Sequence, residues 1–152
     1  MATPPTMIGL EMPDFARWSD RVVVALGQNP GIFTGPGTNT YLVGTGRERI
    51  LLDAGDGKPA YLPVLTQALE QAGGVSIQEI VVTHAHRDHM GGVASVLRRF
   101  GPLKVSKRPW PGADERFGVE IDAIDHRYRD FTDRTFPVAV IFLVPESRLG
   151  GL

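Results

Sequence analysis

The chain has no cysteine among its 152 residues, and this absence narrows the metal chemistry open to it. Without cysteine there is no disulfide framework, and no thiolate is available as a metal ligand. Any bound metal must therefore be held by imidazole and carboxylate groups. A fold without disulfides suits a reducing compartment, so we expect a cytoplasmic protein.

The sequence also lacks a long hydrophobic run and an excess of charge of one sign. Its longest apolar stretch, residues 136–144, falls far short of the ~20 residues that a membrane-spanning helix needs, and it is interpreted as a buried strand or as an unusual tail. Residues 1–15 show no pattern of a targeting signal, and no membrane association is expected. A formal net charge of -1 provides no overall attraction to phosphates, which makes RNA a weaker candidate partner than a small-molecule substrate.

The periodicity of the apolar residues predicts an α/β fold in which helices cover a sheet. β-branched and apolar runs predict strands, and apolar residues three and four positions apart predict helices. The predicted strands are 21–26, 40–44, 50–55 and 80–83, and the predicted helices are 58–72 and 93–100. Strands that alternate with helices in this way are typical of layered α/β domains, which tend to bind ligands at the carboxyl ends of their strands.

Three of the four histidines and an aspartate lie within residues 84–89, in the segment THAHRDHMGG. His84 and His86 are two residues apart, so in an extended chain their imidazoles point to the same side and can converge on one ion. Asp88 continues that parity and His89 breaks it, so these two side chains can hold a second ion. Imidazole and carboxylate ligands suit catalytic zinc, with iron or manganese as alternatives. A hydroxide shared by two such ions is a nucleophile near neutral pH.

The alternative interpretation of this segment is a solvated polar loop. Its position directly after a β-branched strand and before Gly91-Gly92 favours the metal site instead. Other polar and aromatic side chains carry a weaker signal. A group of basic residues either faces phosphate or forms a solvated surface, and the overall charge favours the surface; these are Arg98, Arg99, Lys104, Lys107 and Arg108. Trp18 and Trp110 are expected to be packing or loop residues.

The segment HAHRDH resembles the H-x-H-x-D-H signature of the metallo-beta-lactamase superfamily. Three flanking stretches, GTNTYLVG, ILLDAG and IQEIVVTH, are similar to the same family. Together they look most like the beta-lactamase-like protein 2 group and the related fungal thioesterases of polyketide pathways. The resemblance runs from about Arg21 to Arg99. It implies the αββα sandwich of that family, of which this chain would form the N-terminal half.

The resemblance also implies roles for five side chains. His84 and His86 would bind the first zinc ion, and Asp88 and His89 the second. Asp88 would in addition handle a proton during catalysis. Asp53 would orient a ligand by hydrogen bonding without touching the metal; the alternative for Asp53 is a carboxylate that serves only a turn.

The remaining ligands of the family lie beyond the segment that the resemblance covers. No T-P-G-H turn occurs in the sequence, and His126 lies in AIDHRYRD without the glycine and proline of such a turn, so it is expected to be a surface residue. We therefore expect an N-terminal arm at 1–17, a metallo-beta-lactamase-like N-terminal lobe at 18–118 and a divergent C-terminal tail at 119–152.

The function that follows is a metal-dependent hydrolase, which attacks an ester, thioester or phosphodiester with metal-bound hydroxide. A small molecule or an acyl thioester is the expected substrate, and up to two Zn2+ ions are the expected cofactors. The alternative is a truncated or spliced product that binds metal without catalysis. Half of a sandwich would leave one sheet face uncovered, and self-association through that face is expected.

Overall fold

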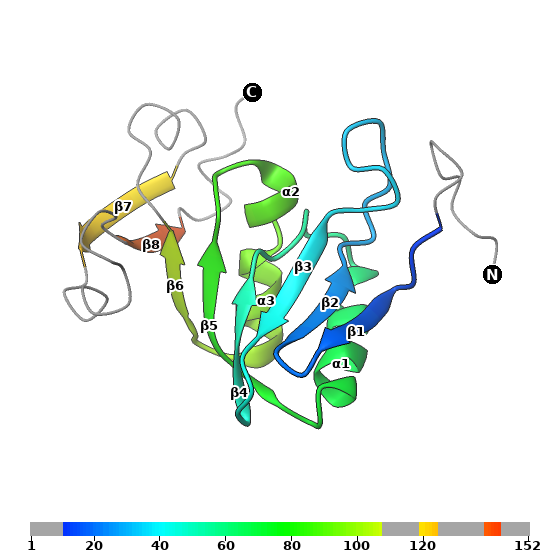
Figure 1. Cartoon of the computed structure of the whole chain (residues 1–152). Coiled ribbons are helices and arrows are strands. Elements are labelled where there is room, and N and C mark those ends of the chain that lie inside the picture. Colours follow the sequence, from blue (N-terminus) through cyan, green and yellow to red (C-terminus); the bar gives the residue numbers. More distant parts are fainter. Residues whose placement is uncertain (1–10, 108–118, 125–138, 144–152) are drawn as a thin grey trace.

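The computed structural model describes residues 11–107 and, for the backbone alone, 119–124 and 139–143 (Figure 1). The strands are β1 (Phe15–Ser19), β2 (Val22–Leu26), β3 (Asn39–Val43), β4 (Glu48–Leu52), β5 (Ser76–Val82), β6 (Lys104–Lys107), β7 (Val119–Ile124) and β8 (Ala139–Leu143). The helices are α1 (Tyr61–Gln71), α2 (Arg87–Met90) and α3 (Val93–Phe100). Among these helices, none combines the length and the apolar character needed to cross a membrane.

The strands form one mixed sheet in the order β1-β2-β3-β4-β5-β6-β8-β7. Strands β1 to β4 pair antiparallel, and β4, β5 and β6 pair parallel. Parallel neighbours need crossover connections, which α1 supplies between β4 and β5 and α3 supplies between β5 and β6. The α/β prediction, with helices covering a mixed sheet, is confirmed.

Several elements differ from the sequence prediction in extent. β1 includes residues 15–17, which were expected in the N-terminal arm. This strand pairs with β2 in the sheet. β7 and β8 both lie within the segment expected as a tail, and β8 falls inside the strand predicted at 136–144. The division into arm, lobe and tail stays a prediction.

The register of the sheet aligns a row of core residues across the central strands. Leu42 pairs with Leu51, which pairs with Ile80, and all three are completely buried. Helices α1 and α3 cover this face of the sheet (Figure 1). Leu65 on α1 and Val96 on α3 are completely buried in the same cluster. Burial of each large apolar side chain is worth about 1.5–3 kcal/mol, so this layer is the main source of stability.

The neighbouring row of side chains points to the opposite face, which none of the described helices covers (Figure 1). Tyr41 pairs with Leu52, which pairs with Val81, and all three are only partly buried. Trp18 is 58% exposed and packs edge to face against Tyr41, with ring centroids 5.8 Å apart. This face is therefore an apolar surface with an exposed aromatic residue at its margin.

One edge of the sheet gathers three loops that are distant in sequence. β2, β4 and β5 run in the same direction, so their carboxyl ends meet at this edge. The segments that follow them are residues 27–38, 53–60 and 83–92. The first segment and α2 project from the same edge (Figure 1).

We expect the uncovered face to cause self-association that Trp18→Lys weakens about tenfold, because a lysine ammonium resists burial against an apolar partner surface. Sedimentation equilibrium over a range of concentrations measures this. Trp18→Phe is the matched control and should retain association. A wild-type chain that stays monomeric throughout the range would contradict the expectation.

Candidate metal centre

The three imidazoles of the THAHRDH segment lie together at the carboxyl end of β5. His84 Nε2 is 3.0 Å from His86 Nδ1, and the two ring centroids are 4.5 Å apart. The chain at His86 is extended, with φ -65° and ψ 143°, whereas residues 83–85 form a bend. The His89 ring returns to within 4.1 Å of the His84 ring, measured between centroids. His84 is therefore in contact with both other rings.

The parity argument is wrong beyond His86, because residues 87–90 form the helical turn α2 and not an extended chain. The turn places Asp88 and His89 side by side in another way. His89 Nε2 lies 3.2 Å from Asp88 Oδ2. The four predicted ligands are thus brought together as two close pairs, the His84–His86 pair and the Asp88–His89 pair.

Asp53 is hydrogen-bonded to His89 directly and to His84 through Thr83. It directly follows β4 and is only 3% exposed, with a φ of 62°, a left-handed conformation that aspartate tolerates better than most residues. Its carboxylate accepts hydrogen bonds from the Thr83 backbone N–H at 2.8 Å, from the Thr83 hydroxyl and from His89 Nδ1 at 2.7 Å. A buried carboxylate needs such donors to offset its desolvation. Asp53 thereby joins β4 to the end of β5 and to α2.

The hydrogen bonds of Asp53 also determine which imidazole nitrogen is free. The single proton of the Thr83 hydroxyl is directed to the Asp53 carboxylate, which can only accept. Thr83 Oγ1 therefore accepts from His84 Nδ1, 2.9 Å away. In His89 the Nδ1 proton is likewise directed to Asp53. In the neutral form of each ring Nε2 then keeps its lone pair, as a ligating histidine requires. His84 Nε2 faces His86 Nδ1, and His89 Nε2 faces Asp88 Oδ2.

The same surroundings change the acidity of two imidazoles. Burial lowers the pKa of His84, and the neighbouring His89 and His86 add to this effect. His84 is therefore neutral near pH 7, the form that binds a metal. The hydrogen bond from His89 to Asp53 raises the pKa of His89, against the opposing effect of burial.

Asp88 is positioned by a second polar chain that begins in the loop after β2. Buried Asn29 donates from Nδ2 to Thr38 Oγ1 at 3.1 Å, and Thr38 donates from that hydroxyl to Asp88 Oδ2 at 2.8 Å. Asn29 Oδ1 also accepts from the Thr38 backbone N–H at 2.8 Å. The sequence analysis did not assign these two residues. Thr38 lies in the GTNTYLVG stretch that carries the family resemblance, whereas Asn29 lies outside it.

Close backbone packing fixes the histidine loop on the loop after β4. The Ala54 N–H donates to the His89 carbonyl at 2.8 Å, and the Gly92 N–H donates to the Gly55 carbonyl at 2.9 Å. A Cβ atom on Gly92 would lie 1.9 Å from the Ala54 carbonyl oxygen, far inside contact distance. Glycine at this position is therefore required for the close approach of the two loops.

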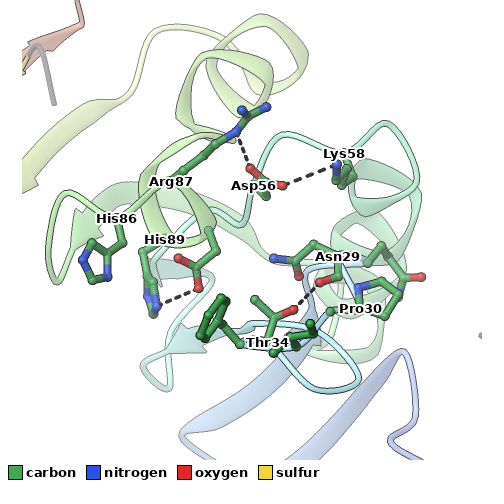
Figure 2. Close-up of a pocket in the computed structure, with 13 residues that line it drawn as sticks. Asn29, Pro30, Thr34, Asp56, Lys58, His86, Arg87 and His89 are labelled. Atoms are coloured by element: carbon green, nitrogen blue, oxygen red, sulfur yellow. Dashed lines mark hydrogen bonds and ion pairs between the residues drawn. The ribbon is translucent and has the colours of Figure 1, made fainter. Parts of the chain in front are cut away.

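A pocket of about 590 Å³ lies beside the ligand pairs (Figure 2). His86, Asp88 and His89 form part of its wall. The tip of the loop after β2 lines the pocket with two apolar side chains, Ile32 at 73% exposure and Phe33 at 100%. The site thus adjoins a hollow with both polar and apolar surfaces.

A cluster of opposite charges occupies another part of the pocket wall. Asp56 accepts from Arg87 Nε at 2.7 Å and lies 3.5 Å from Lys58 Nζ (Figure 2). Its side chain is 16% exposed, against 82% for that of Arg87. Each cation therefore has a part of its side chain free to face the solvent beside the site.

The donor set is compatible with zinc as two pairs. Two imidazole nitrogens bound to one tetrahedral zinc at about 2.05 Å lie roughly 3.3 Å apart, close to the separation in the His84–His86 pair. Among the residues that the structure describes, however, no group of three or more such side chains has an arrangement that would hold an ion. His126, predicted to be a surface residue, lies outside the described residues.

The chain is similar to proteins of one family. A family model described as the metallo-beta-lactamase superfamily matches residues 33–151. Atrochrysone carboxyl ACP thioesterase of Passalora fulva is 44% identical over 94 residues, which are 62% of this chain and 28% of that protein. A lactamase-like protein of Pestalotiopsis microspora is 45% identical over 92 residues, which are 60% of this chain and 28% of that protein.

A solved structure shares the fold. The crystal structure of a metallo-beta-lactamase from Erythrobacter litoralis matches with a TM-score of 0.50 at 22% identity, over 72% of this chain and 47% of that chain. This chain matches 28% of the length of each of the two fungal proteins. The resemblance to this family and to its fungal thioesterases is confirmed.

Gly92→Ala should lower the free energy of unfolding by about 2–3 kcal/mol, because the added methyl group collides with the Ala54 carbonyl. Urea denaturation measures the change. Gly46→Ala is the control, since a Cβ there meets nothing closer than 3.8 Å, and it should change stability by no more than about 0.5 kcal/mol. Equal stability of the Gly92 variant and wild type would refute the close packing.

Thr83→Val should remove the preference of His84 for a proton on Nδ1, because the Thr83 hydroxyl that accepts from Nδ1 is lost. The hydrogen bond from the backbone N–H of residue 83 to Asp53 remains. Imidazole ¹⁵N shifts of the metal-free chain at about pH 8, where neutral histidine prevails, report the tautomer. Thr66→Val, which removes a hydroxyl bonded only to the Leu62 carbonyl, is the control. An unchanged His84 tautomer in Thr83→Val would mean that Asp53 does not act through Thr83.

Proposed function

The chain belongs to the metallo-beta-lactamase superfamily, and we propose that it acts as a zinc-dependent thioester hydrolase with His84, His86, Asp88 and His89 as its metal ligands. One observation carries the proposal. The four side chains meet in two close pairs, of which His86, Asp88 and His89 line a pocket. Hydrogen bonds to Asp53 and from Thr38 orient them.

Each of the two ligand pairs would take part in metal binding. His84 and His86 would hold one ion, and Asp88 and His89 would hold the other or share it. Zinc bound there would supply Lewis-acid activation of the scissile carbonyl and of a water molecule. Asp53 would keep the Nε2 atoms of His84 and His89 available as ligands, since it fixes the proton on Nδ1 directly or through Thr83.

Asp88 is the residue of this chain best placed to accept a proton from the attacking water. Its carboxylate lines the pocket and is partly exposed. Thr38 donates to Oδ2 and so holds the group in one orientation. A positioned carboxylate of this kind typically contributes 10²–10⁴-fold to a rate as a general base.

Two features favour a thioester over the other substrates that the sequence allows. The relative in Passalora fulva is named as a thioesterase that acts on an acyl carrier protein, abbreviated ACP. In addition, Ile32 and Phe33 give the pocket an apolar wall that suits the acyl part of such a substrate. Esters and phosphodiesters share the same chemistry and are the alternative substrate classes.

A second candidate function is metal binding without catalysis. It is favoured by the arrangement of the described ligands as pairs, because a catalytic zinc normally has three protein ligands. By that count each ion here would have about one ligand fewer than the usual number. Metal content and hydrolysis must therefore be measured separately.

We expect the purified chain to bind fewer than two tightly held zinc ions per molecule, by elemental analysis after dialysis. His86→Ala should weaken the remaining zinc at least about tenfold and abolish any zinc-dependent hydrolysis of a generic acyl thioester, because it removes half of the first pair. Zinc binding without hydrolysis would favour the non-catalytic candidate.

His126→Ala is the matched control, since it removes the one histidine outside the segment. It should leave both zinc affinity and hydrolysis unchanged. An equal loss in the His126 and His86 variants would instead assign His126 as a ligand and overturn the proposed set. Zinc affinity that is insensitive to His86→Ala would remove the proposed site altogether.

A further inference from the structure

A second hollow, of about 430 Å³, lies where the start of α1 meets α3. Three cationic side chains line it, those of Lys58, Arg98 and Arg99, and no carboxylate is among the residues that line it. α1 and α3 lie side by side on the helical face of the sheet (Figure 1). The hollow is therefore a concentrated positive surface on a chain whose net charge is close to zero.

Two of these cations have no carboxylate partner within the described part of the chain. Arg98 donates to the hydroxyl of Ser95 at 3.0 Å, and Arg99 lies over the Phe100 ring, 5.2 Å from its centroid. Both side chains are exposed. Neither contact neutralises a guanidinium, so both retain their charge for an anionic ligand. Of the five basic residues considered in the sequence, these two converge, whereas Lys104 and Lys107 lie on β6.

The basic hollow adjoins the pocket of the metal centre. Lys58 lines both, and its Nζ lies 3.5 Å from Asp56 on the side of the metal-centre pocket. One extended molecule can therefore place a reacting group beside His86 and Asp88 and an anionic group between Arg98 and Arg99.

We propose that this hollow binds the phosphate of a phosphopantetheine arm, the thiol-bearing part of the substrate. The proposal rests on the thioesterase function proposed above and names the leaving group. Guanidinium groups bind phosphate oxygens in paired hydrogen bonds, and Lys58 adds a third positive charge. The second carbon from this phosphate bears two methyl groups, which suit the apolar side chains of Pro59 and Leu62 in the same hollow.

The test compares the S-methyl derivatives of phosphopantetheine and of pantetheine, two ligands that differ only in the phosphate and have no free thiol to bind zinc. Isothermal titration calorimetry with the full chain should give about tenfold tighter binding of the phosphorylated ligand. Equal affinities of the two ligands would overturn the proposal.

The double variant Arg98→Gln/Arg99→Gln should reduce the phosphorylated ligand to the affinity of the unphosphorylated one. Arg47→Gln, which removes an exposed arginine at the β3–β4 turn, is the matched control and should retain the tenfold difference. In the wild-type chain, amide shift changes caused by the phosphate should centre on residues 57–59 and 95–99. Shifts centred elsewhere, or a double variant that keeps the difference, would overturn the assignment.

S-methyl coenzyme A, which carries the same arm with further phosphates, distinguishes the two sources of this group. Tighter binding of coenzyme A assigns a free coenzyme A thioester as the substrate, and equal binding assigns the arm alone, as on a carrier protein. Binding is measured without turnover, so phosphate-dependent affinity in a chain that hydrolyses nothing would refute the hydrolase and retain the hollow.

Discussion

The arrangement of the candidate metal ligands depends on the hydrogen bonds of the buried Asp53 carboxylate. This carboxylate is held by backbone geometry at the end of β4, where a positive φ turns its side chain towards β5. From there it accepts from Thr83 and His89, so that one group connects three segments of the chain. Loss of a partner from a buried carboxylate costs about 1–3 kcal/mol for each unsatisfied group, so the arrangement is enforced by folding itself.

The sheet makes this connection possible because it aligns the ends of β2, β4 and β5 at one edge. Each of the three loops then contributes a different kind of restraint. The loop after β2 orients Asp88 through Thr38, the loop after β4 supplies Asp53, and Gly92 allows the backbone of the histidine loop to lie directly on Ala54. The histidine segment is thus fixed by the fold on both sides, independently of a metal.

Local patterns predicted what depends on local structure. The bounds of α3 follow from apolar spacing. The rings of His84 and His86 lie close together as their spacing suggested, although residues 83–85 form a bend and not an extended chain. The parity argument failed at α2, because a single helical turn carries too few residues to show a period. The hydrogen bond from Thr38 to Asp88 could not be predicted from local patterns, because it joins positions 50 residues apart that only the sheet topology brings together. The metal roles of these side chains remain predictions.

The helical turn α2 also determines the ion pair made by the arginine of the HAHRDH segment. A cation between His86 and Asp88 in sequence would oppose metal binding if its charge lay among the ligands. In α2, Arg87 instead points away from the imidazoles, and its Nε donates to Asp56 at 2.7 Å (Figure 2). An extended segment would also have directed Arg87 to the side opposite His86 and Asp88, so the separation alone does not require the turn. What the turn adds is the ion pair of Arg87 with Asp56, whose other carboxylate oxygen lies 3.5 Å from Lys58 Nζ.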